Sequence, residues 1–338
     1  MFAQSETFKR LILSVFLSFI AMITTGFGSF AAADDESAAS PEPEPSAASK
    51  YPGMITHVVP VLATDPSLTS DHRAHWAYLQ PGVKPRGQLL VYLPGTHNSG
   101  KAENAFNSFA AQQGYHVLSL SYICGISVAI FRKSPDPKAF LKGRKNIIYG
   151  TAPIAELQVD PANSILNRLV KALSYLDKAY PKEGWGAYLN KDQLVWSKLA
   201  FAGLSQGGGH ACLLGKQHGV ARVVMFGSPK DYSLYFKRPA DWLSMPSQTP
   251  ITCFFCFNHS LDEKHGCTYA QQVENYKALG LSQRFPIVDV DNNAPPYRHT
   301  RLLTSHRPAD IPKHNHGVVV GDSNYSDAWK YLLTEPCP

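Results

Sequence analysis

Short apolar segments alternate with amphipathic segments from about residue 57 to the end of the chain. Asp160-Pro161 predicts the N-cap and first turn of one helix, because apolar residues follow it at helical spacing. Those apolar positions are Ile165, Leu166, Leu169, Leu173 and Leu176. Continuous apolar strands separated by helices are typical of a parallel sheet covered on both faces. The pattern predicts one α/β domain with about eight mostly parallel strands and helices on both faces.

The expected strands lie at residues 57–63, 75–79, 88–93, 116–121, 198–204, 221–226, 251–257 and 286–290. The expected helices lie at 106–113, from 160 onward, at 206–216 and at 327–333. Two insertions, 123–150 and 229–250, interrupt this alternation; the first is basic and the second is aromatic. Each insertion is compatible with a lid over a pocket and equally with an ordinary surface connection.

The first 33 residues have the features of a secretory signal peptide. Lys9 and Arg10 precede an apolar run at 11–23, and Ala31-Ala32-Ala33 supplies the small residues for cleavage. The apolar run is shorter than the roughly 20 residues of a membrane-spanning helix. We therefore expect a secreted or periplasmic protein, cleaved near Ala33 and not stably inserted in a membrane. Residues 34–50 are rich in Pro, Glu, Ala and Ser and predict a disordered linker, which leaves 51–338 as a single folded domain.

Composition narrows the function classes. Hydrophobic residues make up 44% of the chain, which is enough for a large core and excludes wholesale disorder. The net charge of +6 is mild and spread along the sequence, whereas nucleic-acid binding needs a concentrated basic face. The basic insertion at 123–150 is a weak indication of an acidic substrate. We expect no nucleic-acid partner, and the sequence leaves the oligomeric state open.

Six cysteines in an exported chain are compatible with disulfides. We favour a bond between Cys256 and Cys267, which bracket a short loop, while Cys212 lies in an expected helix and is compatible with a buried thiol. A zinc site competes for some of these residues, but Cys253 and Cys256 are three apart on an expected strand and so point to opposite faces. We therefore expect no metal. The residues of that zinc alternative are Cys253, Cys256, His259, His265 and Cys267.

The segment Gly203-Leu204-Ser205-Gln206-Gly207-Gly208 carries the main chemical signal of the sequence. It matches G-x-S-x-G and lies between an expected buried strand and an expected helix. Such a transition requires a sharp turn that lifts the Ser205 oxygen clear of the sheet, and the glycines leave room for the backbone. The amide of Gln206 then lies at a helix N-terminus, where it can stabilise an oxyanion.

Through this segment the sequence resembles the α/β-hydrolase family, over roughly residues 57–334. The Gly-Leu-Ser-Gln-Gly-Gly form looks like the turns of carboxylesterases and dienelactone hydrolases. The resemblance implies a triad in the order serine, acid after a later strand, histidine near the C-terminus. Asp262 occupies the place of the acid, with Glu263 as its neighbouring alternative. His316 occupies the place of the base, with His314 as the second choice.

The resemblance also implies a second oxyanion donor in the loop after the third strand. Thr96 is the expected donor, and the choice between Gly95, Thr96 and His97 stays open because the loop is not the HGGG form of many lipases. The implied activity is hydrolysis of a small-molecule or polymer-linked carboxylic ester through an acyl-enzyme, without a cofactor. A peptidase or acyltransferase using the same triad, and a non-catalytic binding module of the same fold, are the alternatives.

Overall fold

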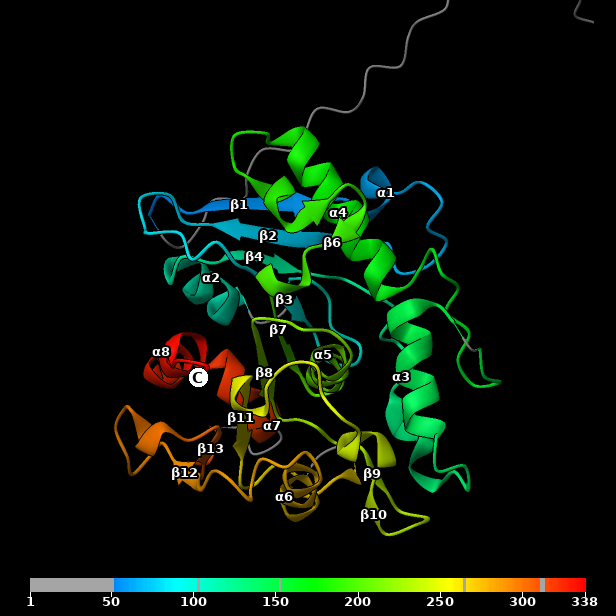
Figure 1. Cartoon of the computed structure of the whole chain (residues 1–338), viewed down its shortest axis with the longest axis vertical. Helices are drawn as coiled ribbons and strands as arrows, with labels where there is room; N and C mark the ends of the chain where they lie inside the picture. The colour runs from blue at the N-terminus through cyan, green and yellow to red at the C-terminus, as the bar shows by residue number, and fades with distance from the viewer. Residues whose placement is uncertain (1–51, 102–103, 152, 264–265, 311–313) are drawn as a thin grey trace, which may run out of the picture. The chain divides into compact units, whose positions relative to one another are not determined.

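A nine-stranded sheet forms the centre of the fold (Figure 1), in the order β1-β2-β4-β3-β7-β8-β11-β13-β12. The computed structural model describes residues 52–338 except 102–103, 152, 264–265 and 311–313, so the expected signal peptide and linker lie outside the described residues. Strand β2 is antiparallel to β1 and β4, and every other neighbouring pair in this sheet is parallel. The strands are β1 Ile55–Val59, β2 His75–Leu79, β3 Leu89–Leu93, β4 His116–Ser119, β7 Leu199–Leu204, β8 Arg222–Phe226, β11 Phe254–His259, β12 Ile287–Asp289 and β13 Leu302–Ser305.

Helices cover both faces of the sheet, and each face has its own apolar core. In β3, Leu89, Val91 and Leu93 join the core beneath α3, α4, α5 and α6, whereas Leu90 and Tyr92 join the core beneath α2, α7 and α8. This division follows from the alternation of side chains along a strand. The helices are α1 Val61–Thr64, α2 Asn104–Gln112, α3 Ala139–Tyr149, α4 Ile165–Ala179, α5 Gln206–Gln217, α6 Tyr269–Ala278, α7 Asn315–Gly321 and α8 Ser326–Thr334.

Shorter elements complete the described part of the chain. Two small hairpins pair β5 Leu189–Asn190 with β6 Gln193–Leu194, and β9 Tyr232–Ser233 with β10 Arg238–Pro239. The 3-10 turns are η1 Val128–Lys133, η2 Trp185–Tyr188, η3 Trp196–Lys198, η4 Asp241–Ser244, η5 Ile251–Cys253, η7 Tyr297–His299 and η9 Ser323–Tyr325. None of the described helices is long and apolar enough to span a membrane.

The predicted α/β fold with a mostly parallel, helix-covered sheet is confirmed, and the differences are local. The sheet has one strand more than expected, because β13 is only four residues long and follows a polar, proline-containing loop. The first strand ends at Val59, since Pro60 lacks an N–H for the ladder and instead precedes α1. The strand expected from residue 251 begins at Phe254, after η5.

The expected start of α4 was wrong. The helix begins at Ile165, where the Ser164 side chain accepts a hydrogen bond from the Asn167 amide. Asp160 accepts a hydrogen bond from the Asn163 amide at 3.0 Å and closes a turn before the helix. Asp160 and Ser164 are both residue types that often cap helices, and the local sequence does not decide which of them caps α4.

The two insertions pack against each other and against the core. The first contains η1 and α3, and the second contains β9, β10 and η4. The Leu234 amide donates to the Arg132 carbonyl at 2.8 Å, which joins them directly. Phe140 and Ile147 from the first insertion and Trp242 from the second are buried in the same apolar core. In the structure both insertions are therefore built into the domain.

All six cysteines are free thiols, so the favoured bond between Cys256 and Cys267 is not formed. Cys256 lies on strand β11 within the core on one face of the sheet, and Cys267 is itself buried just before α6. Cys253 lies in η5, before the strand, and is hydrogen-bonded to Cys337, so the expectation that Cys253 and Cys256 share a strand was wrong. Cys212 is a buried thiol within α5.

Candidate active site

Ser205 lies on a sharp turn between the end of β7 and the start of α5. Its backbone has φ 56° and ψ −114°, a conformation that costs energy for any residue with a Cβ and persists only where the surroundings hold it. The Ser205 amide donates to the Phe226 carbonyl at 2.9 Å, and its carbonyl accepts from the Gly209 amide at 3.1 Å. The turn is therefore tied to the neighbouring strand β8 on one side and to its own helix on the other.

The glycines after Ser205 are required by close packing. A Cβ on Gly207 would collide with the carbonyl oxygen of Leu93, at the end of the adjacent strand β3. A Cβ on Gly209 would collide with the guanidinium of Arg144, which lies across the first turn of α5. Arg144 also donates to the Gln206 carbonyl at 3.0 Å. The glycines thus allow a strand and a buried arginine to approach the turn.

Asp262 and His316 come together at the same edge of the sheet, although 54 residues separate them. Asp262 follows β11, and His316 lies in the first turn of α7, a helix that the sequence analysis did not predict. Their side chains are joined by a hydrogen bond of 2.7 Å between His316 Nδ1 and Asp262 Oδ2. Asp262 is buried and His316 is 7% exposed. This pairing fixes the orientation of the ring and favours a proton on Nδ1.

The environment of Asp262 keeps its carboxyl group ionised. Burial raises its pKa, but the hydrogen bond from His316 and the charges of His316 and Lys230 outweigh this and lower the pKa to about 2. The Lys230 ammonium donates to Asp262 Oδ1 at 2.9 Å. Gln272, on α6, adds a longer contact to Asp262 Oδ2 at 3.4 Å. Both carboxylate oxygens therefore have partners.

The ring of His316 lies against Gly227, directly after β8. An ideal Cβ on Gly227 would be 2.8 Å from His316 Cε1, so only glycine leaves room for the ring at this position. The residue before it, Phe226, accepts the hydrogen bond from the Ser205 amide. Ser205 therefore contacts the last residue of β8, and His316 contacts the residue that follows it.

The structure also shows where the alternative residues lie. His314 and Glu263 are exposed, in contrast to the buried His316 and Asp262. The site thus combines a buried imidazole, held by a buried carboxylate, with a strained serine at a helix N-terminus. Such an arrangement can support nucleophilic catalysis.

The loop after β3 lies beside Ser205, as expected for a source of the second oxyanion donor. An ideal Cβ on Gly95 would be 3.6 Å from Ser205 Cβ, and the Thr96 hydroxyl donates to Gln206 Oε1 at 3.3 Å. The His97 amide donates to the Cys124 carbonyl at 3.1 Å and is thus already engaged. Of the three candidate amides, those of Gly95 and Thr96 remain.

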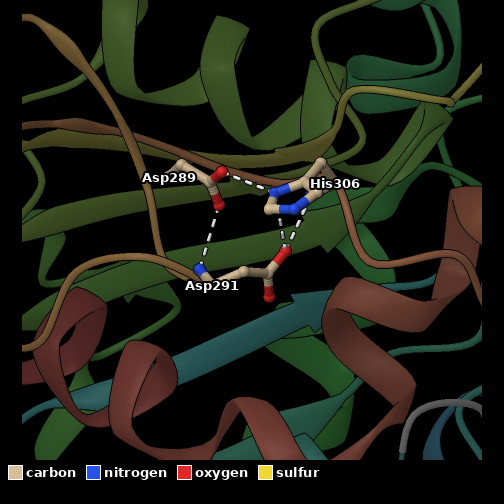
Figure 2. A group of neighbouring side chains, drawn as sticks. All are labelled: Asp289, Asp291 and His306. Atoms are coloured by element: carbon tan, nitrogen blue, oxygen red, sulfur yellow. Dashed lines mark hydrogen bonds and ion pairs between the residues drawn. The ribbon is translucent and has the colours of Figure 1, made fainter.

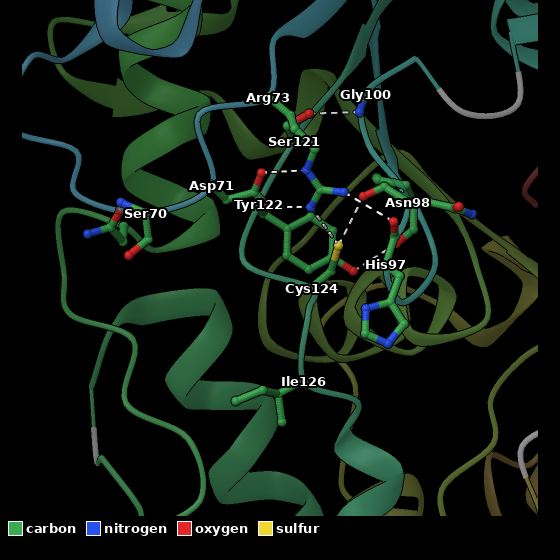
Figure 3. A network of polar contacts seen from close by, with 12 residues as sticks. Ser70, Asp71, Arg73, His97, Asn98, Gly100, Ser121, Tyr122, Cys124 and Ile126 are labelled. Atoms are coloured by element: carbon green, nitrogen blue, oxygen red, sulfur yellow. Dashed lines mark hydrogen bonds and ion pairs between the residues drawn. The ribbon is translucent and has the colours of Figure 1, made fainter.

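A network of polar contacts holds the loop after β3 in place (Figure 3). Arg73 is paired with Asp71 at 2.5 Å, and it donates to the His97 carbonyl at 3.1 Å and to the Cys124 thiol at 3.3 Å. The Cys124 thiol in turn donates to the Asn98 carbonyl at 3.1 Å. These contacts hold the loop through its carbonyl groups.

Gln206 links the loop to the first insertion. Its Oε1 accepts a hydrogen bond from the Val128 amide at 2.9 Å, in addition to the one from Thr96, and its Nε2 donates to the Ile126 carbonyl. The side chain of the residue after the serine is therefore used for structure. Its backbone amide, at the start of α5, retains the place expected of an oxyanion donor.

Sequence reasoning missed two residues of this site. Lys230 gave no signal, because a single lysine in a loop is usually a surface residue. His259 was considered only as a zinc ligand, but its Nδ1 accepts from the Leu261 amide at 3.1 Å and its Nε2 donates to the Arg307 carbonyl at 2.7 Å. Both ring nitrogens are thus occupied in shaping the loop that carries Asp262, and His265 of the same zinc alternative lies outside the described residues.

A second polar group lies at the ends of β12 and β13 (Figure 2). Asp289, Asp291 and His306 have potential ligand atoms within 4.8 Å of one another, and this is the one such group among the described residues. His306 Nδ1 is 2.6 Å from Asp289 Oδ2 and 3.3 Å from Asp291 Oδ2. Asp291 also accepts from the Ser305 hydroxyl and from two backbone amides. Hydrogen bonds within the group account for this arrangement.

Solved structures with a similar fold include several hydrolases. Esterase B from Lactobacillus rhamnosis is 11% identical, with a TM-score of 0.45 over 84% of this chain and 85% of that one. A dienelactone hydrolase from Anabaena variabilis is 14% identical, with a TM-score of 0.40 over 82% and 97% of the two chains. A bacterial heroin esterase is 12% identical, with a TM-score of 0.42 over 83% and 84%. No protein-family model and no curated protein matches this sequence.

Proposed function

We propose that this protein is an exported serine hydrolase that cleaves carboxylic esters through Ser205, His316 and Asp262. The observation that carries the proposal is the 2.7 Å hydrogen bond between Asp262 and His316, formed beside a serine held at φ 56° on a strand-to-helix turn. Export rests on the signal-peptide pattern of residues 1–33. The same triad also serves amide cleavage and acyl transfer, and nothing in the geometry favours either over ester hydrolysis.

In this mechanism the Ser205 oxygen attacks the ester carbonyl carbon while His316 Nε2 accepts the serine proton. The amide of Gln206 and that of Thr96 or Gly95 stabilise the resulting oxyanion. His316 then protonates the leaving alcohol, and the bond between the carbonyl carbon and the alkoxy oxygen breaks. Water, deprotonated by His316, releases the acid and restores Ser205. Asp262 stays ionised throughout and stabilises the protonated ring.

Exposed apolar side chains on the two insertions favour a substrate ester with an apolar portion. Ile126 and Ile130, on the insertion that contacts Gln206, are 42% and 47% exposed, and Tyr235 on the second insertion is 59% exposed. The basic character of the first insertion is weaker in the structure, because Lys142 pairs with Asp136 and Arg144 pairs with Asp231. We therefore expect p-nitrophenyl butyrate to be hydrolysed faster than the corresponding hemisuccinate ester.

A fluorophosphonate probe tests the catalytic part of the proposal, because it modifies a serine only when a base and an oxyanion site activate it. Protein expressed from the full-length chain is labelled, digested and mapped by mass spectrometry. We expect the label on Ser205, and its loss in the Ser205→Ala and His316→Ala variants. We also expect Ser205→Ala to lower ester turnover by roughly 10⁴-fold or more with an unchanged circular dichroism spectrum.

Three other outcomes of these experiments would change the proposed function. A folded protein that takes no label would contradict the proposal and favour a binding module of the same fold. Labelling of Ser205 with product esters formed in the presence of alcohol acceptors would replace hydrolysis by acyl transfer. Full ester turnover in Ser205→Ala would show that another group performs the reaction.

A further inference from the structure

The Asp262 carboxylate binds two side chains at the site, an imidazole and an ammonium group. Asp262 binds His316 through Oδ2 at 2.7 Å and Lys230 through Oδ1 at 2.9 Å. The Lys230 side chain is 10% exposed and that of Asp262 is fully buried. A lysine this far buried has lost most of its hydration, so its charge acts on its neighbours with little screening.

The chain on either side of Lys230 holds the lysine in place. The carbonyl of Pro229 accepts a hydrogen bond from Asn275 on α6 at 3.0 Å. Asp231 is held in a buried ion pair with Arg144 and accepts a hydrogen bond from the Trp242 ring at 2.8 Å. With both neighbours anchored, the ammonium group is directed at Asp262 by the fold.

The charge of Lys230 affects how readily His316, the proposed base, becomes protonated. A carboxylate alone beside His316 would strongly favour the protonated ring, and a protonated ring cannot accept the proton of Ser205. A cation on the far oxygen of the same carboxylate offsets part of its negative potential. The carboxylate still orients the ring, but it biases the ring less toward the charged form.

We propose that Lys230 is a positioning residue of the active site, which fixes the Asp262 carboxylate and offsets its charge so that His316 stays neutral at lower pH. This inference rests on the proposed function and extends it. Lys230 acts through Asp262, and substrate does not contact it in this role.

The other titratable groups around Asp262 are few among the described residues. Cys267 precedes α6 and Tyr276 lies on it; burial raises the pKa of the Cys267 thiol to about 12 and that of the Tyr276 hydroxyl well above its usual value, so both are neutral at working pH. His259 is hydrogen-bonded through both ring nitrogens. Asp231 is neutralised by Arg144. Arg132, from the first insertion, is a further cation near Cys267 among the described residues.

The pH dependence of fluorophosphonate labelling tests the inference without knowledge of the substrate. The rate constant for modification of Ser205 is measured from pH 4.5 to about 9 in the wild type and in Lys230→Gln, Lys230→Met and Lys230→Arg. We expect the acidic limb to move to higher pH by about one unit in the Gln and Met variants. Lys230→Arg keeps the charge and is expected to keep the limb of the wild type.

Lys216→Gln is the matched control, because Lys216 is also buried but donates to the Leu243 carbonyl, away from Asp262. We expect its acidic limb to match that of the wild type. An unmoved limb in folded Lys230→Gln and Lys230→Met would overturn the inference, as would unfolding of both variants, which would make Lys230 a residue of stability only. Absence of any label in the wild type would instead contradict the proposed function, so the two failures are distinguishable.

Discussion

Position 227 is occupied by glycine because the ring of His316 lies where a side chain would otherwise begin. Gly227→Ala would place a Cβ 2.8 Å from His316 Cε1 and displace the ring from Asp262. We expect the labelling rate of Ser205 to fall by about 10-fold or more, because a shift near 1 Å is costly for a positioned base. The measurement is fluorophosphonate labelling under fixed conditions.

Gly280→Ala provides the control for that substitution. Gly280 also has a positive φ, at 83°, but nothing lies within 4 Å of its ideal Cβ. It therefore reproduces the backbone cost of an alanine in the left-handed region without touching a ring. Equal losses in the two variants would show that backbone strain, and not displacement of His316, explains the effect.

A second residue-scale prediction concerns acid stability. His75 is fully buried, and its Nδ1 accepts a hydrogen bond from the Ser121 amide at 3.0 Å. Burial, with the nearby charge of Arg168, lowers the pKa of His75 from 6.5 to about 3. The folded state therefore holds this ring neutral while the unfolded state protonates it below pH 6.5. The free energy of unfolding is expected to fall as pH decreases from about 6.5 toward 3, by up to about 1.4 kcal/mol per pH unit.

His75→Asn retains an acceptor for the Ser121 amide but cannot be protonated. We expect the decline of the free energy of unfolding between pH 6.5 and 4 to be shallower in this variant, measured by urea denaturation at several pH values. His72→Asn changes an exposed neighbour and is expected to leave the slope unchanged. An identical slope in wild type and His75→Asn would contradict the assignment.

At the scale of elements, Arg144 connects three segments that are distant in the sequence. It extends from α3 to Asp231 in the second insertion and to the first turn of α5, and it lies 5.6 Å from the ring centre of Trp242. Arg144 and Asp231 are each only 1% exposed. The two insertions are thus joined to the helix that follows Ser205 by a buried ion pair.

Removing one partner of this pair leaves the other charge buried and uncompensated. We expect Arg144→Met to lower the free energy of unfolding by about 3–5 kcal/mol. The double variant Arg144→Met with Asp231→Leu is expected to recover much of that loss, because neither charge remains. Urea denaturation measures both. A double variant no more stable than Arg144→Met alone would contradict this expectation.

At the scale of the whole molecule, the parallel sheet determines where the site forms. Strands β3, β7, β8 and β11 are neighbours and parallel, so the loops after their carboxyl ends meet at one edge. Those loops carry Thr96, Ser205, Lys230 and Asp262, and α7 brings His316 to the same place through the contact with Gly227. Five chain segments that are distant in the sequence thereby form one polar site.

We also expect the chain to be cleaved after its N-terminal signal-peptide pattern. The signal-peptide pattern predicts that the exported protein begins at or near Asp34, after Ala31-Ala32-Ala33. Expression of the full-length chain in a secreting host, followed by N-terminal sequencing of the protein outside the cell, measures this. An uncleaved chain retained in the membrane fraction would contradict export with cleavage.

Several features could be predicted from the sequence because their causes are local. Apolar runs and helical spacing indicated the α/β fold, since side-chain periodicity depends on residues close together in the chain. The turn at Ser205 was predictable from glycines within a few residues of it, whereas Asp262 was implied by the resemblance to the α/β-hydrolases. The short strand β13 and the start of α4 were not, because four residues carry little periodicity and two capping residues competed.

Only the tertiary structure decided which distant groups meet. Asp262 pairs with His316 rather than His314, Lys230 donates to the same carboxylate, and His259 is hydrogen-bonded through both ring nitrogens. None of these three contacts has a local signal in the sequence. Each depends on strands and helices that are separated by tens of residues and come together at one edge of the sheet. The sequence by itself determined the elements and the strained serine turn, whereas contacts between elements determined the charges and orientations around that serine, because these depend on three-dimensional proximity.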